Sequence, residues 1–170
     1  TKGILINSPS NPTGTVFPPE IIRLICEIAI KHDLYVISDE VYARMIYDEN
    51  CSFFSPSSID SCLERTIVIN GFSKAFAMTG WRVGVVVAPT DVSAKITLLS
   101  ESIVSCVPGF VQDAARAAIL CPSATTEKMY SKYRSRQLEI CSQLNKGGLE
   151  IKHLPQGCLL YTSDAADDTP

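Results

Sequence analysis

Residues 66–84 read TIVINGFSKAFAMTGWRVG and contain the pattern that decides the fold. The opening run, Thr66–Ile69, is rich in β-branched residues and has the length of a short buried strand. A polar cluster containing Lys74 follows directly, which places this lysine just beyond the predicted strand end. Desolvation at such a position favours the neutral, nucleophilic form of the amine. The alternative from these residues alone is an ordinary surface lysine.

Arg82 lies eight residues beyond Lys74. Its guanidinium is a permanent, fork-shaped cation that suits phosphate oxygens. The neighbouring Gly80 and Gly84 permit a close approach of the backbone to a ligand. The alternative is an arginine whose stem lies along the edge of the core.

Outward from this stretch, strand-length apolar runs alternate with longer segments of helical period, which predicts an α/β fold with a mostly parallel sheet flanked by helices. The predicted strands cover Gly3–Asn7, Leu34–Ile37, Thr66–Ile69 and Val83–Ala88. Helices are predicted to begin at Pro18-Pro19 and to cover Asp91–Ser105, Phe110–Leu120 and Thr126–Leu144. The pair Gly147-Gly148 should end the last helix, and Glu150–Leu154 could begin another strand.

The helix that begins at Pro18-Pro19 has an apolar stripe that should pack on the sheet. Its members recur at three- and four-residue spacing: Ile21, Ile22, Leu24, Ile25, Ile28 and Ala29.

Length and charge limit the function classes. The 170 residues, 46% of them hydrophobic and 19% charged, are enough for one sizeable core. A net charge of -3 argues against a nucleic-acid partner, because such proteins need a surplus of cations. The longest apolar stretch, Val83–Ala88, is far shorter than the ~20 residues that span a bilayer, so we expect no membrane partner.

The seven cysteines form no CxxC pair, which argues against a zinc or redox dithiol site, and we expect no metal. Their odd number and their apolar surroundings suit buried thiols in a reducing, cytoplasmic compartment.

Two further polar clusters follow predicted strands, and the carboxyl ends of strands are where α/β sheets place their chemistry. Asn11-Pro12-Thr13-Gly14 is by itself a turn. Ser38-Asp39-Glu40-Val41-Tyr42 could equally begin a helix, with Ser38 or Asp39 as its N-cap.

Taken together and in this order, NSPSNPTG, SDEVY and NGFSKAFAMTGWRVG resemble the class I/II aminotransferases, which are fold-type I enzymes that use pyridoxal 5'-phosphate. The Ala-Met-Thr-Gly-Trp-Arg string is most similar to the aspartate, alanine and aromatic transaminase branch. The resemblance covers about Lys2 to Gly157 and implies part of the family's large domain. It also implies a transferase that moves an amino group between an amino acid and a 2-oxo acid.

The resemblance assigns a role to each motif residue. Lys74 would form the Schiff base with the cofactor and then carry the substrate proton as general base and acid. Asp39 would pair with the pyridine nitrogen and keep it protonated. Asn11 and Tyr42 would both donate to the phenolic oxygen and tune the pKa of the Schiff base.

For the phosphate, the resemblance implies Arg82 as a bidentate partner and Ser73 as a hydroxyl partner. One departure is visible three residues before the lysine. The family often has a second phosphate-binding serine there, whereas this chain has Gly71.

The resemblance also implies that the chain is the central part of an enzyme. Residues 1–149 would be a partial cofactor-binding large domain and residues 150–157 the start of the small domain. Residues 158–170 resemble a translated sequencing adapter, and we expect no native structure from them. The family's ring-stacking aromatic and its substrate-binding arginine match nothing here, so we expect this chain to be inactive alone and the complete protein to be a homodimer.

Two alternatives remain open. A pyridoxal-phosphate lyase of the same fold, such as a carbon-sulfur lyase, would use the same lysine, aspartate and arginine. An aminotransferase-like domain could instead sense a ligand within a transcriptional regulator. A nucleotide-binding domain is disfavoured because neither GxGxxG nor GxxxxGK[ST] occurs.

Overall fold

The computed structural model describes residues 1–120, 124–149, 151 and 154–158. Its strands are β1 (Gly3–Asn7), β2 (Tyr35–Asp39), β3 (Thr66–Gly71) and β4 (Gly84–Val87). The longer helices are α1 (Pro19–Lys31), α3 (Thr90–Ile103), α4 (Gly109–Leu120) and α5 (Ala124–Lys146). Shorter elements are the α-helix α2 (Asp60–Leu63) and the 3₁₀ turns η1 (Pro56–Ser58) and η2 (Thr79–Trp81).

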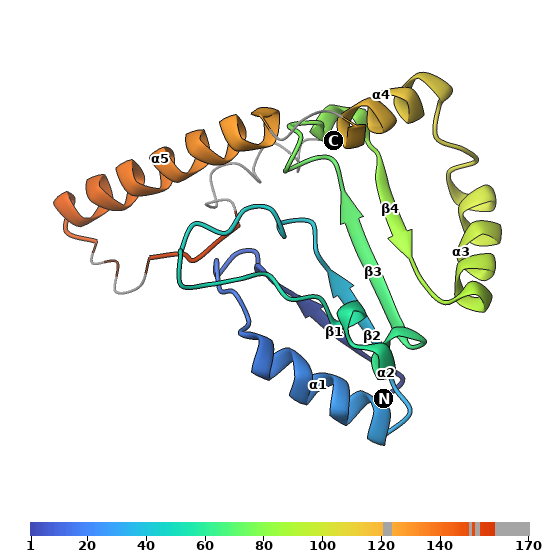
Figure 1. The fold of residues 1–170 in the computed structure, drawn as a ribbon. Coiled ribbons are helices and arrows are strands. Elements are labelled where there is room, and N and C mark those ends of the chain that lie inside the picture. Colours follow the sequence, from blue (N-terminus) through green and yellow to red (C-terminus); the bar gives the residue numbers. More distant parts are fainter. Residues whose placement is uncertain (121–123, 150, 152–153, 159–170) are drawn as a thin grey trace.

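The four strands form one sheet in the order β1-β2-β3-β4. β1 with β2 and β2 with β3 are parallel pairs, whereas β3 with β4 is antiparallel. In Figure 1 α1 flanks β1 and β2, while α3 and α4 lie on the β4 side. The prediction of an α/β fold with a mostly parallel sheet is therefore confirmed.

The register of the parallel strands aligns their carboxyl ends. Asp39, the last residue of β2, pairs with Asn7 at the end of β1 and with Ile69 near the end of β3. The polar segments after all three strands consequently begin at one edge of the sheet.

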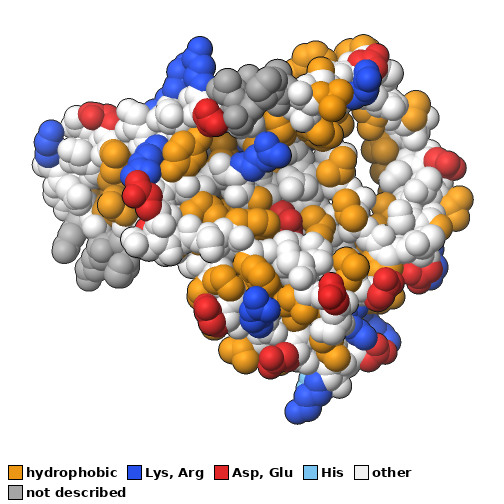
Figure 2. All heavy atoms as spheres, in the orientation of Figure 1, with side chains coloured by type: hydrophobic (Ala, Val, Ile, Leu, Met, Phe, Trp, Pro, Cys, Tyr) orange, Lys and Arg blue, Asp and Glu red, His pale blue; other side chains and the backbone are white. Residues whose placement is uncertain are grey.

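Helix α1 packs on the sheet through a narrower face than the apolar stripe predicts. Ile22, Cys26 and Ala29 are buried together with Ile6 of β1 and Val36 of β2. The prediction was wrong for three stripe members because the apolar set spans more of the helix than the roughly 100° that can face a sheet. The exposed members are Ile21, Leu24 and Ile28, and hydrophobic side chains are visible over this helix in Figure 2.

The sequence predicts buried strands over Leu34–Ile37 and Thr66–Ile69, and this is wrong at Tyr35 and Ile69, which are exposed. Alternation along β1 and β2 sends Ile6 and Val36 toward α1 and sends Leu5 and Tyr35 to the opposite face. Leu5 and Tyr35 are exposed, because α1 covers only the first of these faces.

A second core connects the segment after β2 to helix α5. Tyr42, Met45 and Tyr47 are buried in it, and Tyr130 and Tyr133 of α5 pack against them. The Tyr47 and Tyr130 rings lie 5.6 Å apart between centroids. This cluster joins the chain after β2 to the distant carboxyl-terminal helix.

The remaining predictions concern the second half of the chain. Helices α3, α4 and α5 agree with prediction to within two residues at each end, and α5 ends at Lys146, just before Gly147-Gly148. Of the strand predicted over 150–154, the structure describes only Ile151 and Leu154. Neither residue is in a strand, so the prediction is wrong at these two positions.

Burial of the thiols is confirmed for most of the described cysteines. Of these, Cys26, Cys62, Cys141 and Cys158 are buried, Cys51 is half-buried and Cys106 is exposed. Cys121 lies outside the described residues.

Candidate functional site

Asp39 ends strand β2 and marks the centre of the candidate site. Its side chain is half-buried, and Oδ1 accepts a hydrogen bond from the backbone N–H of Val41 at 3.2 Å. That bond turns the chain sharply away from the sheet. Residues 41–44 form turns and not the helix that an N-cap at Ser38 or Asp39 would begin, so the capping alternative is wrong.

Tyr42 and Asn11 come together from segments 31 residues apart. The Nδ2 group of Asn11 lies 3.2 Å from Oη of Tyr42 and donates a hydrogen bond to it. Tyr42 is buried, whereas Asn11 is exposed and is tied to the end of β1 by a bond from its N–H to Oδ1 of Asn7. A phenol and an amide therefore share one location at the carboxyl edge of β1 and β2.

Lys74 lies in the turn that follows β3 and is 8% exposed, so the surface-lysine alternative is wrong. Its Nζ sits 5.9 Å from the centroid of the Tyr42 ring, within the range of a cation–π contact. The backbone around it is held by bonds from Phe76 N to Phe72 O and from Met78 N to Ser73 O. The structure thus brings together Asn11, Tyr42 and Lys74, three of the predicted site residues.

Ser73 and Arg82, the two predicted phosphate partners, lie at the two ends of the turn segment. Ser73 is half-buried beside Lys74. Arg82 is exposed, has a left-handed backbone (φ 50°) and donates from Nη1 to the Thr79 carbonyl at 3.0 Å. This short internal bond bends the guanidinium back over its own turn, so Arg82 does not lie along the core edge.

A buried carboxylate next to Asp39 escaped the sequence reasoning. Glu40 is 6% exposed, and its Oε1 accepts hydrogen bonds from Ser38 Oγ (3.0 Å) and Ser55 Oγ (2.5 Å). Burial raises the pKa of Glu40, and the two hydroxyls act in the opposite direction. Alternation along β2 gives the only signal for it, since a polar pair at positions 38 and 40 shares one face.

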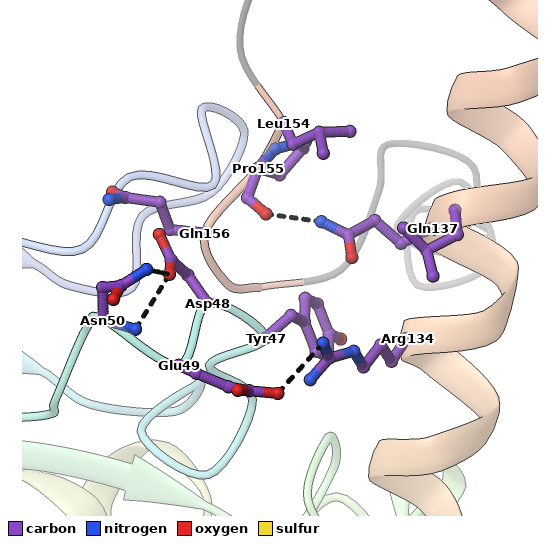
Figure 3. A pocket seen from close by; sticks show the side chains of 10 residues that line it. Tyr47, Asp48, Glu49, Asn50, Arg134, Gln137, Leu154, Pro155 and Gln156 are labelled. Atoms are coloured by element: carbon purple, nitrogen blue, oxygen red, sulfur yellow. Dashed lines mark hydrogen bonds and ion pairs between the residues drawn. The ribbon is translucent and has the colours of Figure 1, made fainter.

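The segment Leu154–Cys158, called the strap below, lies against the loops of the site. Its last residue, Cys158, is the first of the tail from which we expect no native structure, yet it is buried in the cluster of Met45 and Tyr47. Gln156 N and Gly157 N both donate to the carbonyl of Gly14, at 2.9 Å each. On the other side, Tyr47 N donates to Gln156 O at 2.7 Å. Figure 3 shows this region, with α5 contributing Arg134 and Gln137 from the far side of a pocket of about 400 Å³.

Among the described residues, no group of three or more His, Cys, Asp and Glu side chains is arranged to hold a metal ion. Within the same part of the chain, no helix is long and apolar enough to cross a bilayer.

Comparison with known proteins gives a consistent result. The family described as aminotransferase class I and II matches residues 1–168. Aspartate aminotransferase of Pyrococcus abyssi is 42% identical over 88% of this chain, and aromatic-amino-acid aminotransferase 2 of Thermococcus litoralis is 39% identical over the same share. The chain spans 39% of the length of each of these relatives.

Solved structures agree with the sequence matches. The aromatic aminotransferase of Pyrococcus horikoshii superposes with a TM-score of 0.86 and 39% identity, over 92% of this chain and 42% of that one. The aspartate aminotransferase of Thermotoga maritima superposes with a TM-score of 0.83 and 34% identity, over 93% of this chain and 40% of that one. The fold, the order of the motifs and these matches agree, and the chain belongs to the class I and II aminotransferase family.

Proposed function

We propose that this chain forms the central part of a pyridoxal-phosphate-dependent aminotransferase, with residues 1–149 in the large domain and residues 150–157 at the start of the small domain. The meeting of Lys74, Tyr42 and Asn11 beyond the carboxyl ends of the strands carries this proposal. The relatives that support it are named aspartate and aromatic aminotransferases.

The side chains of the site fit the cofactor in chemical type. The buried amine of Lys74 suits the aldehyde of the cofactor, and the carboxylate of Asp39 suits its ring nitrogen. The phenol of Tyr42 and the amide of Asn11 suit its phenolic oxygen. The exposed guanidinium of Arg82 suits its phosphate. Pyridoxal phosphate, when bound, supplies an aldehyde for a lysine amine and a ring that withdraws electrons from the substrate. No metal is needed for this chemistry.

Lys74 and Asp39 are the catalytic residues of the proposal. Lys74 Nζ holds the cofactor covalently at rest and, once displaced, moves a proton at the substrate's α-carbon as general base and acid. Lys74 is buried beside Tyr42, at the place where the proposal needs its amine. The negative charge of the Asp39 carboxylate would keep a proton on the ring nitrogen, and a protonated ring accepts electrons from the substrate more readily.

Tyr42 completes the catalytic set, and the other residues bind and orient. Tyr42 Oη and Asn11 Nδ2 donate to the phenolic oxygen, and their mutual contact keeps both groups at one place. Arg82 and Ser73 bind the phosphate, for which Arg82 releases its bond to Thr79. The exposure of Arg82 leaves its guanidinium accessible to such a ligand.

Covalent labelling of the lysine tests the proposal directly. The protein from the complete reading frame that encodes this chain should absorb visible light with pyridoxal phosphate, and borohydride reduction should fix a pyridoxyl group on Lys74. Lys74→Ala should abolish the absorbance, whereas Lys95→Ala, an exposed lysine on α3, should keep it. An unchanged spectrum in Lys74→Ala would refute the assignment.

A product assay tests the reaction type. We expect transfer of the amino group only when a 2-oxo acid acceptor is present. Release of pyruvate and ammonia without an acceptor would instead indicate a lyase. We also propose that the complete protein is a homodimer, which its mass in solution checks, and that the 170-residue chain alone shows no turnover.

A further inference from the structure

The strap, residues 154–158, is tied to both loops that supply the Asn11–Tyr42 contact. Gln156 is its central residue. Its backbone joins Gly14 on one side and Tyr47 on the other, and the N–H of Asp48 adds a bond of 3.2 Å to the same Gln156 carbonyl. The strap therefore bridges two segments that do not share a strand.

The Gln156 side chain, like its backbone, forms hydrogen bonds to both segments. Oε1 accepts from the N–H of Val16 at 3.0 Å, and Nε2 donates to Sγ of Cys51 at 3.0 Å. Val16 is buried, so its N–H depends on this side chain for a partner.

Each tie is connected to a predicted site residue through a short turn. Gly14 N donates to Ser10 O at 2.8 Å, which closes the turn that carries Asn11. On the other side, Met45 N donates to Tyr42 O and Met45 O accepts from Cys158 N, at 2.8 and 2.9 Å. A shift of the strap would therefore displace both partners of the Asn11–Tyr42 contact.

Close approach of backbones requires glycine at two points of this assembly. Gly14 has φ +70°, and a Cβ on it would collide with Pro155. A Cβ on Gly157 would lie 2.6 Å from the Met45 carbonyl oxygen. The strap also borders two open pockets, of about 400 and about 780 Å³, which share Asp48, Leu154, Pro155 and Gln156. Hydrogen bonds, rather than close packing all round, thus set its position, and Figure 3 shows one of them, from Gln137 to the Pro155 carbonyl.

We propose that Gln156 is a positioning residue: it locks the turn that carries Asn11 against the segment that follows Tyr42, and so holds these two side chains at the cofactor's phenolic oxygen. The last clause rests on the proposed function. The hydrogen bonds by which Gln156 joins the two segments do not rest on the proposed function, because they are contacts within this chain. Gln156 makes no contact with the reacting atoms in this proposal.

The test compares Gln156→Met with Gln143→Met in the protein from the complete reading frame. The first change removes both side-chain bonds at nearly constant length, and the second affects an exposed glutamine on α5 that bonds only Glu139. Hydrogen exchange at Val16 and over residues 47–51 should become at least about tenfold faster in Gln156→Met alone, because the Val16 N–H loses its partner and Cys51 Sγ keeps only its bond to Asp48.

The second readout is the pH midpoint of the visible absorbance with bound pyridoxal phosphate. Weaker donation by Asn11 and Tyr42 to the phenolic oxygen should raise this midpoint by about half a pH unit in Gln156→Met. Should that variant fail to fold, Cys51→Ala removes the bond from Gln156 Nε2, together with the Cys51 bond to Asp48, and keeps the bond from Val16 to Gln156. It should give a smaller shift in the same direction.

An unchanged midpoint together with faster exchange would make Gln156 merely structural and overturn the proposal, and unchanged exchange would overturn the tie itself. Absence of visible absorbance in the unmodified protein would refute the proposed function instead, and the exchange readout would still test the tie.

Discussion

The buried hydroxyl of Ser55 offers the sharpest test of the electrostatics beside Asp39. Its Oγ donates to Glu40 Oε1 at 2.5 Å and accepts from Ser57 N at 3.2 Å. Since the single hydroxyl hydrogen of Ser55 is used on Glu40, the Ser57 hydroxyl, 2.8 Å away, must donate to Ser55. The substitution Ser55→Ala deletes the centre of this chain of bonds.

The expected cost depends on whether Glu40 is ionised. A buried hydrogen bond to a carboxylate is worth about 1.5–3 kcal/mol, and one between neutral groups about 0.5–1.5 kcal/mol. We therefore expect Ser55→Ala to lower the free energy of unfolding by about 2–3 kcal/mol at pH 7.5 and by about 1 kcal/mol at pH 4.

The sign of this pH dependence follows from the pKa of Glu40. Burial raises the folded-state pKa above that of the unfolded chain, so the contribution of Glu40 to stability is greatest in acid and is lost as pH rises through the folded pKa. The Ser55 hydroxyl opposes this rise. Without it the pKa of Glu40 rises further, and the variant loses more stability than the parent between acid and neutral pH.

Urea unfolding at the two pH values measures the difference, provided that the slope m is unchanged. Ser102→Ala is a matched control, because its exposed hydroxyl bonds only its own helix, and it should cost less than about 0.5 kcal/mol. In a Glu40→Gln background, Ser55→Ala should cost about 1 kcal/mol at both pH values. An equal loss at pH 4 and pH 7.5 in the parent would refute the reasoning.

Three further predictions address catalysis, packing and thiol reactivity. Asp39→Ala should keep part of the cofactor absorbance but lower kcat by at least ~100-fold, because binding and electron withdrawal are separable, and full activity would contradict its role. Ile22→Ala should lower the free energy of unfolding by about 2–5 kcal/mol in urea titrations, whereas exposed Ile21→Ala should cost less than about 1 kcal/mol; similar costs would contradict the packing of α1. A thiol reagent at pH 8 should modify exposed Cys106 well before Cys26, whose pKa burial raises to about 12, as peptide mapping would show.

Local chemistry explains why the elements were predictable. Thr66–Ile69 is a β-branched run between polar segments, and β3 begins at Thr66 as predicted. Pro18 and Pro19 cannot continue a strand but can open a helix, and α1 begins at Pro19. Such signals lie within a few residues of the element that they determine.

Contacts between distant segments were not predictable from the same signals. Val16 and Gln156 are 140 residues apart, and nothing local to either residue indicates their hydrogen bond. Ser55 and Glu40 are likewise joined only by the path of the loop after β2. The motif residues of the candidate site could be named because their order and spacing resemble a family, but the hydrogen bonds that join Glu40 to Ser55 and Gln156 to Val16 cross between segments and follow from no single motif.

The alternation of side chains at the end of β2 explains how two adjacent carboxylates can do different work. Asp39 pairs in register with Asn7 and turns the chain toward Tyr42, whereas Glu40 shares the face of Ser38, on the side of the sheet that also carries buried Val36. The charge of Asp39 contributes to the raised pKa of Glu40 even from the opposite face, and a shared face would bring the two carboxylates closer and strengthen this repulsion. Because successive side chains of a strand point to opposite faces of the sheet, one step along the backbone separates Asp39 from the buried Glu40. The hydroxyls of Ser38 and Ser55 stabilise the ionised form of the buried Glu40, and they bond to that carboxylate and not to Asp39.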